Sequence, residues 1–461
     1  MSEPLNVKGR RVLVVGLGKS GVSSALFLQS MGGRVTVSDS KTEDQLREEI
    51  PTLLDRGIAV ETGGHGERTF RDQDLIVISP GVPFNVPQLA QARQMGIPVI
   101  GEIELASLYL KGKIVAITGS NGKTTTTSLT GEILNKGGFK AQVGGNIGTP
   151  AISFVGDSTE DSYNVLEISS FQLETIKTFR PYIAAVINVT PDHLDRHGSF
   201  EGYAVAKERV FENQTAEDYA ILNADDPTCV AMAGRVKSQV RWISPKHGVD
   251  NGAFIRDEQI VYRESGRETQ IMPVSELQLK GAHNLENVLC AVSAGMIVGC
   301  RPEDIRRAVA EFKAVEHRLE FVTAINGVQY YNDSKATNVD ATIKALESFP
   351  KNIHIILGGK DKGSDYTVLK PLLQERVKQV YTIGAAAEKI ENHIAGAAPV
   401  ARAGTLENAI RLATEKAQPG DVVLLAPACA SFDQFQSYEH RGRVFKDTVR
   451  QLERMMAGSS R

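Results

Sequence analysis

Short apolar runs of strand length alternate with helix-like stretches along almost the whole chain. In the first hundred residues, these runs occupy residues 11–16, 34–39 and 74–81. Runs of this kind, separated by longer stretches with helical character, are typical of parallel strands joined by helices. The pattern therefore predicts an α/β fold with mainly parallel sheets, beginning with a Rossmann-like unit.

A second unit is predicted to open with a strand that ends at Thr118 and a helix that starts near Thr124. The glycine pair 137–138 should end this helix, since glycine is common just past a helix C-terminus. Further strand-like runs follow at residues 163–169, 182–190 and 219–226. Residues 248–279 are predicted to form hairpins, and residues 283–295 an amphipathic helix.

A third unit begins near Glu316, and its predicted strands lie at residues 327–333, 352–359, 379–384 and 421–427. The chain has 461 residues, and domains average about 150 residues, so three domains are expected. We place them at residues 1–101, 102–314 and 315–461, as a Rossmann-like domain, a central P-loop-type ATPase domain and a second Rossmann-like domain.

Composition narrows the class of protein. The net charge is −3, without the basic excess that is typical of nucleic-acid-binding proteins. The four cysteines lie far apart, which favours a reducing compartment over a disulfide framework. The N-terminus lacks an apolar signal segment, and no apolar run reaches the roughly 20 residues of a membrane helix. We expect a monomeric cytoplasmic protein that binds small molecules, not nucleic acid or membranes.

The strongest local signal is a glycine-rich loop between the predicted strand and helix of the second unit. In such a loop, backbone N–H groups can bind phosphate oxygens, Lys123 can reach the β- and γ-phosphates, and the Thr124 hydroxyl can bind Mg²⁺. The general P-loop pattern has a glycine where Ile117 stands, and a plain glycine turn with a solvated lysine is the alternative. The predicted ATP-binding loop consists of Gly119, Ser120, Asn121, Gly122, Lys123, Thr124 and Thr125.

Two further polar residues lie at or just past the ends of two later strands of this unit. Glu167 lies near the end of one strand and His193 just past the next. Ligands of open α/β sheets bind at the carboxyl ends of the strands, so both side chains should lie at the same edge as the phosphate loop. A carboxylate there can bind Mg²⁺, whereas each residue taken alone could be an ordinary loop residue. Lys207 would ordinarily be a solvated helix lysine.

The first unit carries a dinucleotide-type fingerprint. Gly16, Gly18 and Gly21 follow a strand and open a helix, and Asp39 ends the next strand. This spacing favours a diphosphate held over a helix N-terminus. A dehydrogenase that binds NAD and a protein that binds a UDP-linked substrate both fit, and a purely structural glycine turn is a third alternative.

Many segments, in order along nearly the whole chain, resemble those of the Mur ligase family. They include ITGSNGKTTT, GGNIGTP, LEISSFQL, NVTPDHLDRH, YAVAKERVFENQ, GAHNLENVLCA, HRLE, NDSKATN, LGGKDKG and PACASFDQFQSYEHRG. The SNGKTT, NDSKATN and ACASFDQF segments are most similar to the member that adds D-glutamate. The diamino-acid signature of another member is missing, although other Mur ligases and a non-catalytic nucleotide-binding protein remain alternatives.

The resemblance implies an activity. ATP phosphorylates the carboxylate of UDP-N-acetylmuramoyl-L-alanine, and the amine of D-glutamate attacks the acyl phosphate. ATP and Mg²⁺, with two ions expected, are the implied cofactors. Lys123, His193 and a carbamylated Lys207 are the implied catalytic residues.

The resemblance also implies four sets of ligands. The metal set is Thr124, Glu167, His193 and Lys207, and the further ATP contacts are Asn284, Asn287, Arg318, Asp333 and Lys335. The UDP-substrate set is Lys19, Ser20, Asp39, Gly81 and Asn146. The D-glutamate set is Thr337, Lys362, Ser431 and Tyr438. Members of the family have a phenylalanine at the position of Tyr438.

Overall fold

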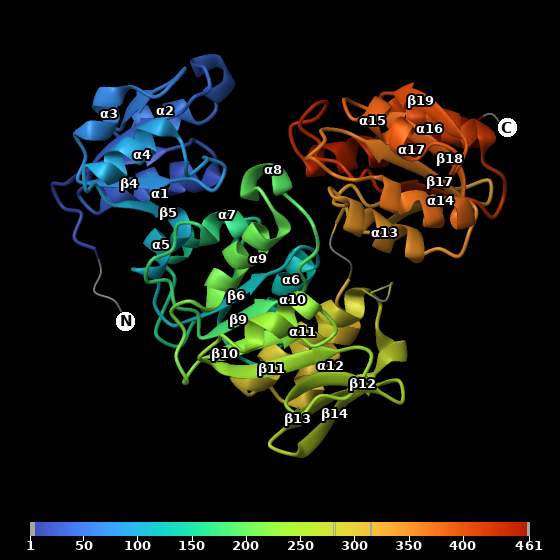
Figure 1. Ribbon diagram of the computed structural model, residues 1–461, viewed down its shortest axis with the longest axis horizontal. Helices are drawn as coiled ribbons and strands as arrows, with labels where there is room; N and C mark the ends of the chain where they lie inside the picture. Colours follow the sequence, from blue (N-terminus) through green and yellow to red (C-terminus); the bar gives the residue numbers. More distant parts are fainter. Residues whose placement is uncertain (1–4, 280, 282, 314–315, 459–461) are drawn as a thin grey trace. The chain divides into compact units, whose positions relative to one another are not determined.

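The computed structural model of the chain describes residues 5–279, 281, 283–313 and 316–458. It contains three β-sheets formed one after another along the chain, with helices packed against each (Figure 1). The fold is α/β with mainly parallel sheets in three domains, which confirms the prediction from the apolar pattern. The predicted boundary between residues 314 and 315 lies outside the described residues.

The first sheet has five parallel strands in the order β3-β2-β1-β4-β5. Its strands are β1 (Arg11–Val15), β2 (Arg34–Ser38), β3 (Ala59–Glu61), β4 (Leu75–Ile78) and β5 (Val99–Gly101). Its helices are α1 (Lys19–Ser30), α2 (Ile50–Leu54), α3 (Glu67–Arg71) and α4 (Pro87–Gln94), and α5 (Glu102–Ser107) leads to the next domain. The three strands predicted for this unit correspond to β1, β2 and β4.

The second sheet has nine strands in the order β14-β13-β12-β11-β10-β9-β6-β8-β7. They are β6 (Lys113–Thr118), β7 (Ala141–Gly145), β8 (Tyr163–Glu167), β9 (Ile183–Val186), β10 (Tyr219–Asn223), β11 (Gln239–Ser244), β12 (Gly252–Arg256), β13 (Gln259–Glu264) and β14 (Arg267–Pro273). The last three form the predicted hairpins, since β13 is antiparallel to both of its neighbours.

The helices of this domain are α6 (Lys123–Lys136), α7 (Ser170–Leu173), α8 (Leu194–His197), α9 (Phe200–Glu208), α10 (Pro227–Ala233), α11 (His283–Val298) and α12 (Pro302–Glu311). The predicted helix after the phosphate loop is α6, and the predicted amphipathic helix is α11. Every residue of β8, and every residue of β6 after its first, is buried, because strands at the centre of a parallel sheet are covered on both faces.

The third sheet has the order β15-β16-β20-β17-β18-β19. Its strands are β15 (Glu320–Ile325), β16 (Val328–Asn332), β17 (Ile353–Gly358), β18 (Val377–Ile383), β19 (Val400–Gly404) and β20 (Val422–Leu425). Its helices are α13 (Val339–Glu347), α14 (Lys370–Arg376), α15 (Ala387–His393), α16 (Leu406–Lys416) and α17 (Tyr438–Gly458). Successive residues of β17 enter separate hydrophobic cores, Ile355 on one side and Ile356 on the other.

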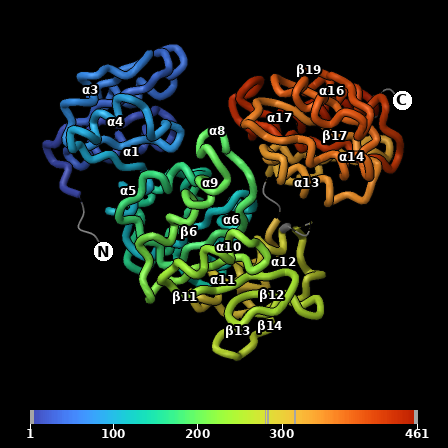
Figure 2. Tube along the Cα trace, in the orientation of Figure 1, coloured from blue at the N-terminus to red at the C-terminus, as the bar shows by residue number. Residues whose placement is uncertain are grey.

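The chain packs as two compact units. The first contains residues up to Val189 with Ala204–Ser275 and Glu286–Val309, and so holds the first two sheets. The second contains Thr190–Tyr203, Glu276–Leu285 and the residues from Ala310 onward, and so holds the third sheet. In Figure 2, where colour follows residue number, each sheet and the helices around it share one continuous range of colour, so each is built from one continuous part of the chain.

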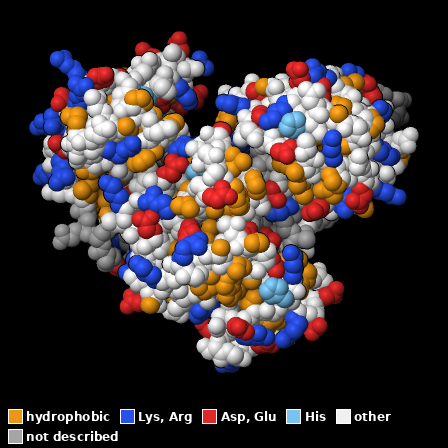
Figure 3. Space-filling model, in the orientation of Figure 1, with side chains coloured by type: hydrophobic (Ala, Val, Ile, Leu, Met, Phe, Trp, Pro, Cys, Tyr) orange, Lys and Arg blue, Asp and Glu red, His pale blue; other side chains and the backbone are white. Residues whose placement is uncertain are grey.

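Charged side chains of both signs are interspersed over the face shown in Figure 3. This mixture agrees with the small net charge of −3. Within the described part of the chain, no helix is both long enough and apolar enough to cross a membrane.

Candidate functional site

The phosphate loop joins β6 to α6. Gly122 is the N-cap of α6 and has a φ of 85°, a backbone conformation that favours glycine. A Cβ atom at Gly122 would lie 1.9 Å from Oδ1 of Asn287, so α11 approaches the loop closely at this point. Asn188 holds the other side of the loop, because its Oδ1 accepts a hydrogen bond of 2.9 Å from the Asn121 N–H. The loop joins β6 to α6, as predicted, and it is also held by Asn188 and by the close approach of α11, which its sequence position did not predict.

Two lysine side chains meet at this loop. Nζ of Lys123 donates to the carbonyl oxygens of Gly119 and Ser120, both at 2.8 Å. Nζ of Lys207, which lies on α9, donates to the same Gly119 oxygen at 2.8 Å. Lys207 is only 1% exposed, so it is not the solvated helix lysine that its local sequence would suggest. Burying an amine is costly unless its surroundings offset the penalty, which singles out this position.

Glu167 lies at the end of β8 and is 2% exposed. Its Oε2 accepts a hydrogen bond of 2.6 Å from the Thr124 hydroxyl, and its Oε1 accepts one of 2.8 Å from Nδ2 of Asn146. The structure therefore brings together the two predicted metal ligands Thr124 and Glu167. It also brings Asn146, predicted for the UDP-substrate, to the same carboxylate.

Asn287 is 1% exposed on α11, and its Oδ1 accepts a hydrogen bond of 3.3 Å from the Thr126 hydroxyl. Asn284, which is also predicted to contact ATP, is 5% exposed near the start of the same helix. Both predicted asparagines are therefore buried near the start of α11, and Asn287 contacts the phosphate-loop region directly.

His193 has a left-handed backbone, with a φ of 53°. It belongs to the second compact unit, whereas Lys123 and Glu167 belong to the first, so their predicted convergence stays a prediction. Its neighbour Asp192 was missed as a site residue. Oδ2 of Asp192 accepts a hydrogen bond of 3.0 Å from Nδ2 of Asn338, and its Oδ1 lies 3.3 Å from Nζ of Lys362.

The glycine-rich turn of the first domain joins β1 to α1, which begins at Lys19 and Ser20. Gly21 permits the close helix–strand approach, because a Cβ atom there would lie 1.8 Å from the Gly16 carbonyl oxygen. The Asp39 carboxylate accepts hydrogen bonds from the backbone N–H groups of Leu17, at 2.6 Å, and Lys41, at 2.8 Å. This carboxylate therefore ties the turn to the end of β2.

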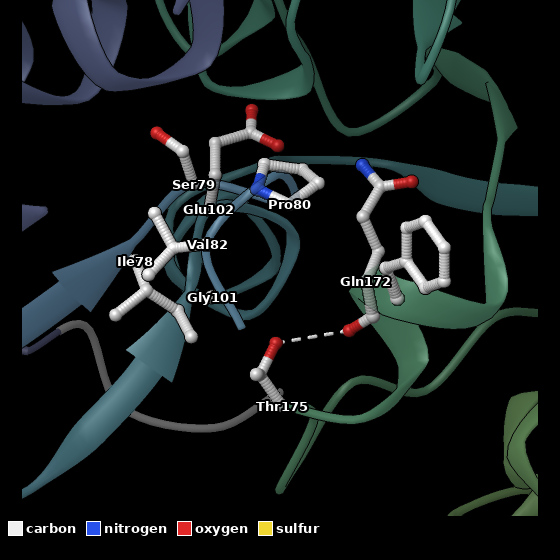
Figure 4. Close-up of a pocket in the computed structure, with 9 residues that line it drawn as sticks. Ile78, Ser79, Pro80, Val82, Gly101, Glu102, Gln172 and Thr175 are labelled. Atoms are coloured by element: carbon white, nitrogen blue, oxygen red, sulfur yellow. Dashed lines mark hydrogen bonds between the residues drawn. The ribbon is translucent and has the colours of Figure 1, made fainter. Parts of the chain in front are cut away.

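A small cavity lies at the carboxyl end of β4, and the two neighbours of Gly81 in sequence, Pro80 and Val82, help to line it. It is lined by residues of the Ile78–Val82 segment, of α5 and of α7, which are shown as sticks in Figure 4. Glu102 is 1% exposed there, and its Oε1 accepts a 2.9 Å hydrogen bond from the Ile152 N–H. Its Oε2 has no hydrogen-bond partner among the described residues. Burial raises the pKa of Glu102 to about 7.

In the third domain, Asp333, Lys335 and Thr337 follow β16, Lys362 follows β17 and Ser431 follows β20, whereas Arg318 precedes β15 and Tyr438 begins α17. Asp333 is 6% exposed, and burial raises its pKa to about 6 against the opposing charges of Arg318 and Lys335. Nζ of Lys335 donates a 3.3 Å hydrogen bond to the Tyr438 hydroxyl and lies 5.1 Å from the ring centroid. Lys335 and Tyr438, predicted for different ligands, are thus in direct contact.

Arg441 was missed by the sequence reasoning. Its side chain is 0% exposed, and it donates hydrogen bonds to the Ser334 hydroxyl at 2.9 Å and to the carbonyl oxygens of Ser334 at 2.8 Å and Cys429 at 3.1 Å. Burial lowers its pKa to about 10. It joins the loop that carries Lys335 to the loop that carries Ser431. Arg441 lies in the EHRG end of the segment PACASFDQFQSYEHRG, which carries the family resemblance but gave this arginine no role of its own.

Arg318 lies between two residues with left-handed backbones, His317 with a φ of 66° and Leu319 with a φ of 41°. The Leu319 N–H donates to Oδ1 of Asp333 at 3.3 Å. Strained backbone of this kind persists only where neighbouring contacts hold it. The backbone beside Arg318 is therefore held in part by Asp333, another residue predicted to bind nucleotide.

Comparison with known proteins identifies the class that this fold and loop define. Residues 10–101 match the Mur ligase MurD-like N-terminal domain, residues 117–295 the Mur ligase middle domain, and residues 317–429 the Mur ligase glutamate ligase domain. The chain belongs to the Mur ligase family. This confirms the resemblance read from its motifs and gives no support to the dehydrogenase alternative.

Among its relatives are two proteins named UDP-N-acetylmuramoylalanine–D-glutamate ligase. The one from Koribacter versatilis is 68% identical over 97% of this chain and 99% of its own length. The one from Acidobacterium capsulatum is 60% identical over 96% of this chain and 97% of its own length.

The fold also matches solved structures. A UDP-N-acetylmuramate–alanine ligase from Thermotoga maritima has a TM-score of 0.61 at 19% identity, over 96% of this chain and 99% of its own. A pseudomurein peptide ligase from Methanothermus fervidus has a TM-score of 0.61 at 19% identity, over 96% of this chain and all of its own.

Proposed function

We propose that the protein is an ATP-dependent ligase that joins D-glutamate to UDP-N-acetylmuramoyl-L-alanine and releases ADP and phosphate. The observation that carries the proposal is the phosphate loop, where Lys123 and Lys207 meet at Gly119 and Thr124 meets Glu167. The particular substrates are supported by the names of relatives that are 68% and 60% identical over almost the whole chain.

In this proposal, the loop N–H groups and the Lys123 ammonium bind the phosphates of ATP. The Thr124 hydroxyl and the Glu167 carboxylate lie 2.6 Å apart, and both are oxygen ligands of the kind that Mg²⁺ prefers. When bound, Mg²⁺ supplies charge neutralisation and polarises the phosphoryl oxygens. His193 is proposed as a further ligand.

The chemistry has two steps. A carboxylate oxygen of the L-alanyl group attacks the γ-phosphorus, ADP leaves, and an acyl phosphate forms. The amine of D-glutamate then attacks the carbonyl carbon and loses a proton, and phosphate leaves with the electron pair of the C–O bond. The protein mainly aligns the reactants and offsets the repulsion between anions, which is the larger part of catalysis in phosphoryl transfer.

The ligand sets are assigned by motif and supported by placement. The further ATP contacts are Asn284, Asn287, Arg318, Asp333 and Lys335. The UDP-substrate contacts are Lys19, Ser20, Asp39, Gly81 and Asn146, where the start of α1 offers N–H groups to a diphosphate. The D-glutamate contacts are Thr337, Lys362, Ser431 and Tyr438, where an ammonium and hydroxyls suit carboxylates.

We further propose that Lys207 is carbamylated: its neutral amine would form a C–N bond to carbon dioxide and lose a proton, which would turn a buried amine into an anion able to bind a second Mg²⁺. Its 1% exposure and its position beside the phosphate loop support this. We predict that Lys207→Ala lowers the turnover by about a hundredfold or more and that a short-chain carboxylic acid partly restores it. The control is Lys136→Ala, at the C-terminal end of α6. Full activity of Lys207→Ala without added acid would refute the carbamate.

The proposed domains are residues 1–101 for the UDP-substrate, 102–314 for ATP and 315–461 for the amino acid. We also propose that the protein works as a cytoplasmic monomer on soluble precursors of the cell wall.

The test is a reaction with purified protein, ATP, Mg²⁺ and UDP-N-acetylmuramoyl-L-alanine, offered a panel of amino acids that includes D- and L-glutamate, L-alanine and diamino acids. We expect phosphate release and a product mass increase for D-glutamate. Turnover with another amino acid and none with D-glutamate would move the protein to a different branch of the family.

A further inference from the structure

Two loops of the third domain carry the residues proposed to bind D-glutamate. The loop after β17 carries Lys362, and the loop after β20 carries Ser431. They pair through their backbones, because the Lys360 N–H donates to the Ala430 oxygen at 2.8 Å and the Ala430 N–H donates to the Lys360 oxygen at 3.1 Å. Beyond this pair of hydrogen bonds, a side-chain link joins the same loops.

The link is the hydroxyl group of Tyr366. Tyr366 is 0% exposed, and its hydroxyl donates a hydrogen bond of 2.7 Å to Oδ1 of Asp361, the residue before Lys362. The same hydroxyl oxygen lies 3.0 Å from Sγ of Cys429, two residues before Ser431. One side-chain oxygen therefore contacts both loops.

The direction of the hydrogen bonds follows from the chemistry of the three groups. Oδ2 of Asp361 accepts from Nζ of Lys389 at 2.7 Å, and Oδ1 also accepts from the Ser364 N–H at 3.2 Å. Burial raises the pKa of Asp361, but these donors and Tyr366 outweigh it and lower the pKa overall. Burial raises the pKa of the Cys429 thiol to about 11. The thiol therefore donates to the tyrosine oxygen, and the tyrosine donates to an ionised carboxylate.

The aromatic ring alone does not explain the residue. The ring lies in the hydrophobic core beside Leu369 and Ile355, where a phenylalanine would fill the same volume. The hydroxyl adds polar contacts that are all directed at the two loops. A hydrogen bond to a charged acceptor is stronger than one between neutral groups, so the hydroxyl fixes the position of Asp361 more than the ring does.

We propose that Tyr366 is a positioning residue for the glutamate site: its hydroxyl links Asp361 to Cys429 and so sets the spacing between the Lys362 ammonium and the Ser431 hydroxyl. This rests on the proposed function, since it assumes that these two groups bind the amino-acid substrate. Tyr366 itself does not touch the substrate. Its removal should therefore weaken glutamate binding and leave the ATP and UDP-substrate sites unchanged.

The test compares Tyr366→Phe with Tyr330→Phe. Tyr330 is also 0% exposed in the same domain, and its hydroxyl donates a 2.9 Å hydrogen bond to Oγ1 of Thr414, but it lies in the other hydrophobic core. Both changes remove one buried hydroxyl and keep the ring. We expect Tyr366→Phe to raise KM for D-glutamate about fivefold or more, the loss expected for a hydrogen bond to a charged group. KM for ATP and for the UDP-substrate should stay unchanged, and Tyr330→Phe should change none of the three.

Cys429→Ala provides a second, independent variant, since it removes the other end of the link. It should raise KM for D-glutamate selectively, and the double variant with Tyr366→Phe should be less than additive. Equal effects of Tyr366→Phe and Tyr330→Phe, or an unchanged KM for D-glutamate in both Tyr366→Phe and Cys429→Ala, would overturn the inference. A wild-type protein that does not turn over D-glutamate at all would instead overturn the proposed function and the inference with it.

Discussion

Two glutamates of α5 show how their surroundings decide what a buried carboxylate does. Glu104 accepts hydrogen bonds from the backbone N–H groups of Lys177, Thr178 and Phe179, at 2.8, 2.8 and 3.0 Å, and from the Thr178 hydroxyl at 2.6 Å. Glu102, two residues earlier, accepts one at 2.9 Å from Ile152. The Glu104 carboxylate therefore binds α5 to the central domain, whereas the surroundings of Glu102 favour its protonated form.

This difference gives a prediction for stability. Burial raises the pKa of Glu102 from its ordinary value of 4.5 to about 7, so the folded protein holds a proton there that the unfolded chain has lost. The contribution of Glu102 to the free energy of unfolding is therefore largest below pH 4.5. It falls as the pH rises to about 7 and is then constant. Glu102→Gln keeps the acceptor for Ile152 and should raise the free energy of unfolding at pH 8 by up to about 3 kcal/mol.

Urea unfolding of the wild type and Glu102→Gln at pH 5 and pH 8 measures this difference. The gain at pH 8 should be larger than the gain at pH 5. Glu104→Gln is the matched control, and it should be destabilised because an amide replaces an acceptor with a donor facing N–H groups. A Glu102→Gln variant whose stability relative to wild type does not depend on pH would contradict the pKa that burial implies.

At the residue scale, the sequence predicted side chains that belong to local motifs. Thr124 and Glu167 were placed at one edge of the sheet because both follow parallel strands, and they lie 2.6 Å apart. The burial of Lys207 had no local signal, since α9 alone does not show which of its sides faces the phosphate loop. The link from Tyr366 to Cys429 spans 63 residues of sequence, and no spacing rule reports such a contact.

At the scale of single elements, the turn before α6 combines two demands on one glycine. Gly122 has a φ of 85°, and a Cβ atom there would meet Oδ1 of Asn287 at 1.9 Å. Gly138, just after the same helix, has a φ of 86° with nothing within 4 Å of its Cβ position. The two positions therefore share the backbone requirement and differ in the close contact.

We predict that Gly122→Ala and Gly138→Ala each cost about 1–2 kcal/mol of stability because of the left-handed backbone. Only Gly122→Ala should lose ATP turnover, by about a hundredfold, because the added methyl group displaces Asn287 and the loop. Thermal unfolding and phosphate release distinguish the two effects. Comparable activity in the two variants would show that the contact with α11 does not matter for the loop.

Elements with strong periodicity were predicted well. The predicted helix after the phosphate loop is α6, and the predicted hairpins are β12 to β14. The strands β15 and β19 were not predicted, because several of their residues are exposed and their sequences lack a continuous apolar run. They lie at the two edges of the third sheet, where packing on the neighbouring strand decides the structure.

At the scale of the whole molecule, the proposed ATP contacts come from both compact units. Asn287 and the phosphate loop belong to the first unit, whereas Arg318 and Lys335 belong to the second. If one nucleotide contacts residues of both units, as we propose, its binding should bring the units together. The molecule should therefore become more compact when its substrates bind.

Small-angle scattering tests this closure. We predict a smaller radius of gyration with a non-hydrolysable ATP analogue, Mg²⁺ and UDP-N-acetylmuramoyl-L-alanine than without them. Lys335→Ala should reduce the change, because it removes a contact from the second unit. An identical scattering curve with and without these ligands would rule out closure as the way in which the two units share the nucleotide.

The central claim is that the carboxylate of the UDP-substrate attacks the γ-phosphorus before any amine reacts. It is tested most directly by labelling that carboxylate with ¹⁸O, running the complete reaction with D-glutamate, and measuring the mass of the released phosphate. An acyl phosphate intermediate carries one ¹⁸O atom into the inorganic phosphate. Phosphate that contains no ¹⁸O would mean that the carboxylate is not activated in this way, and would contradict the role given to the phosphate loop.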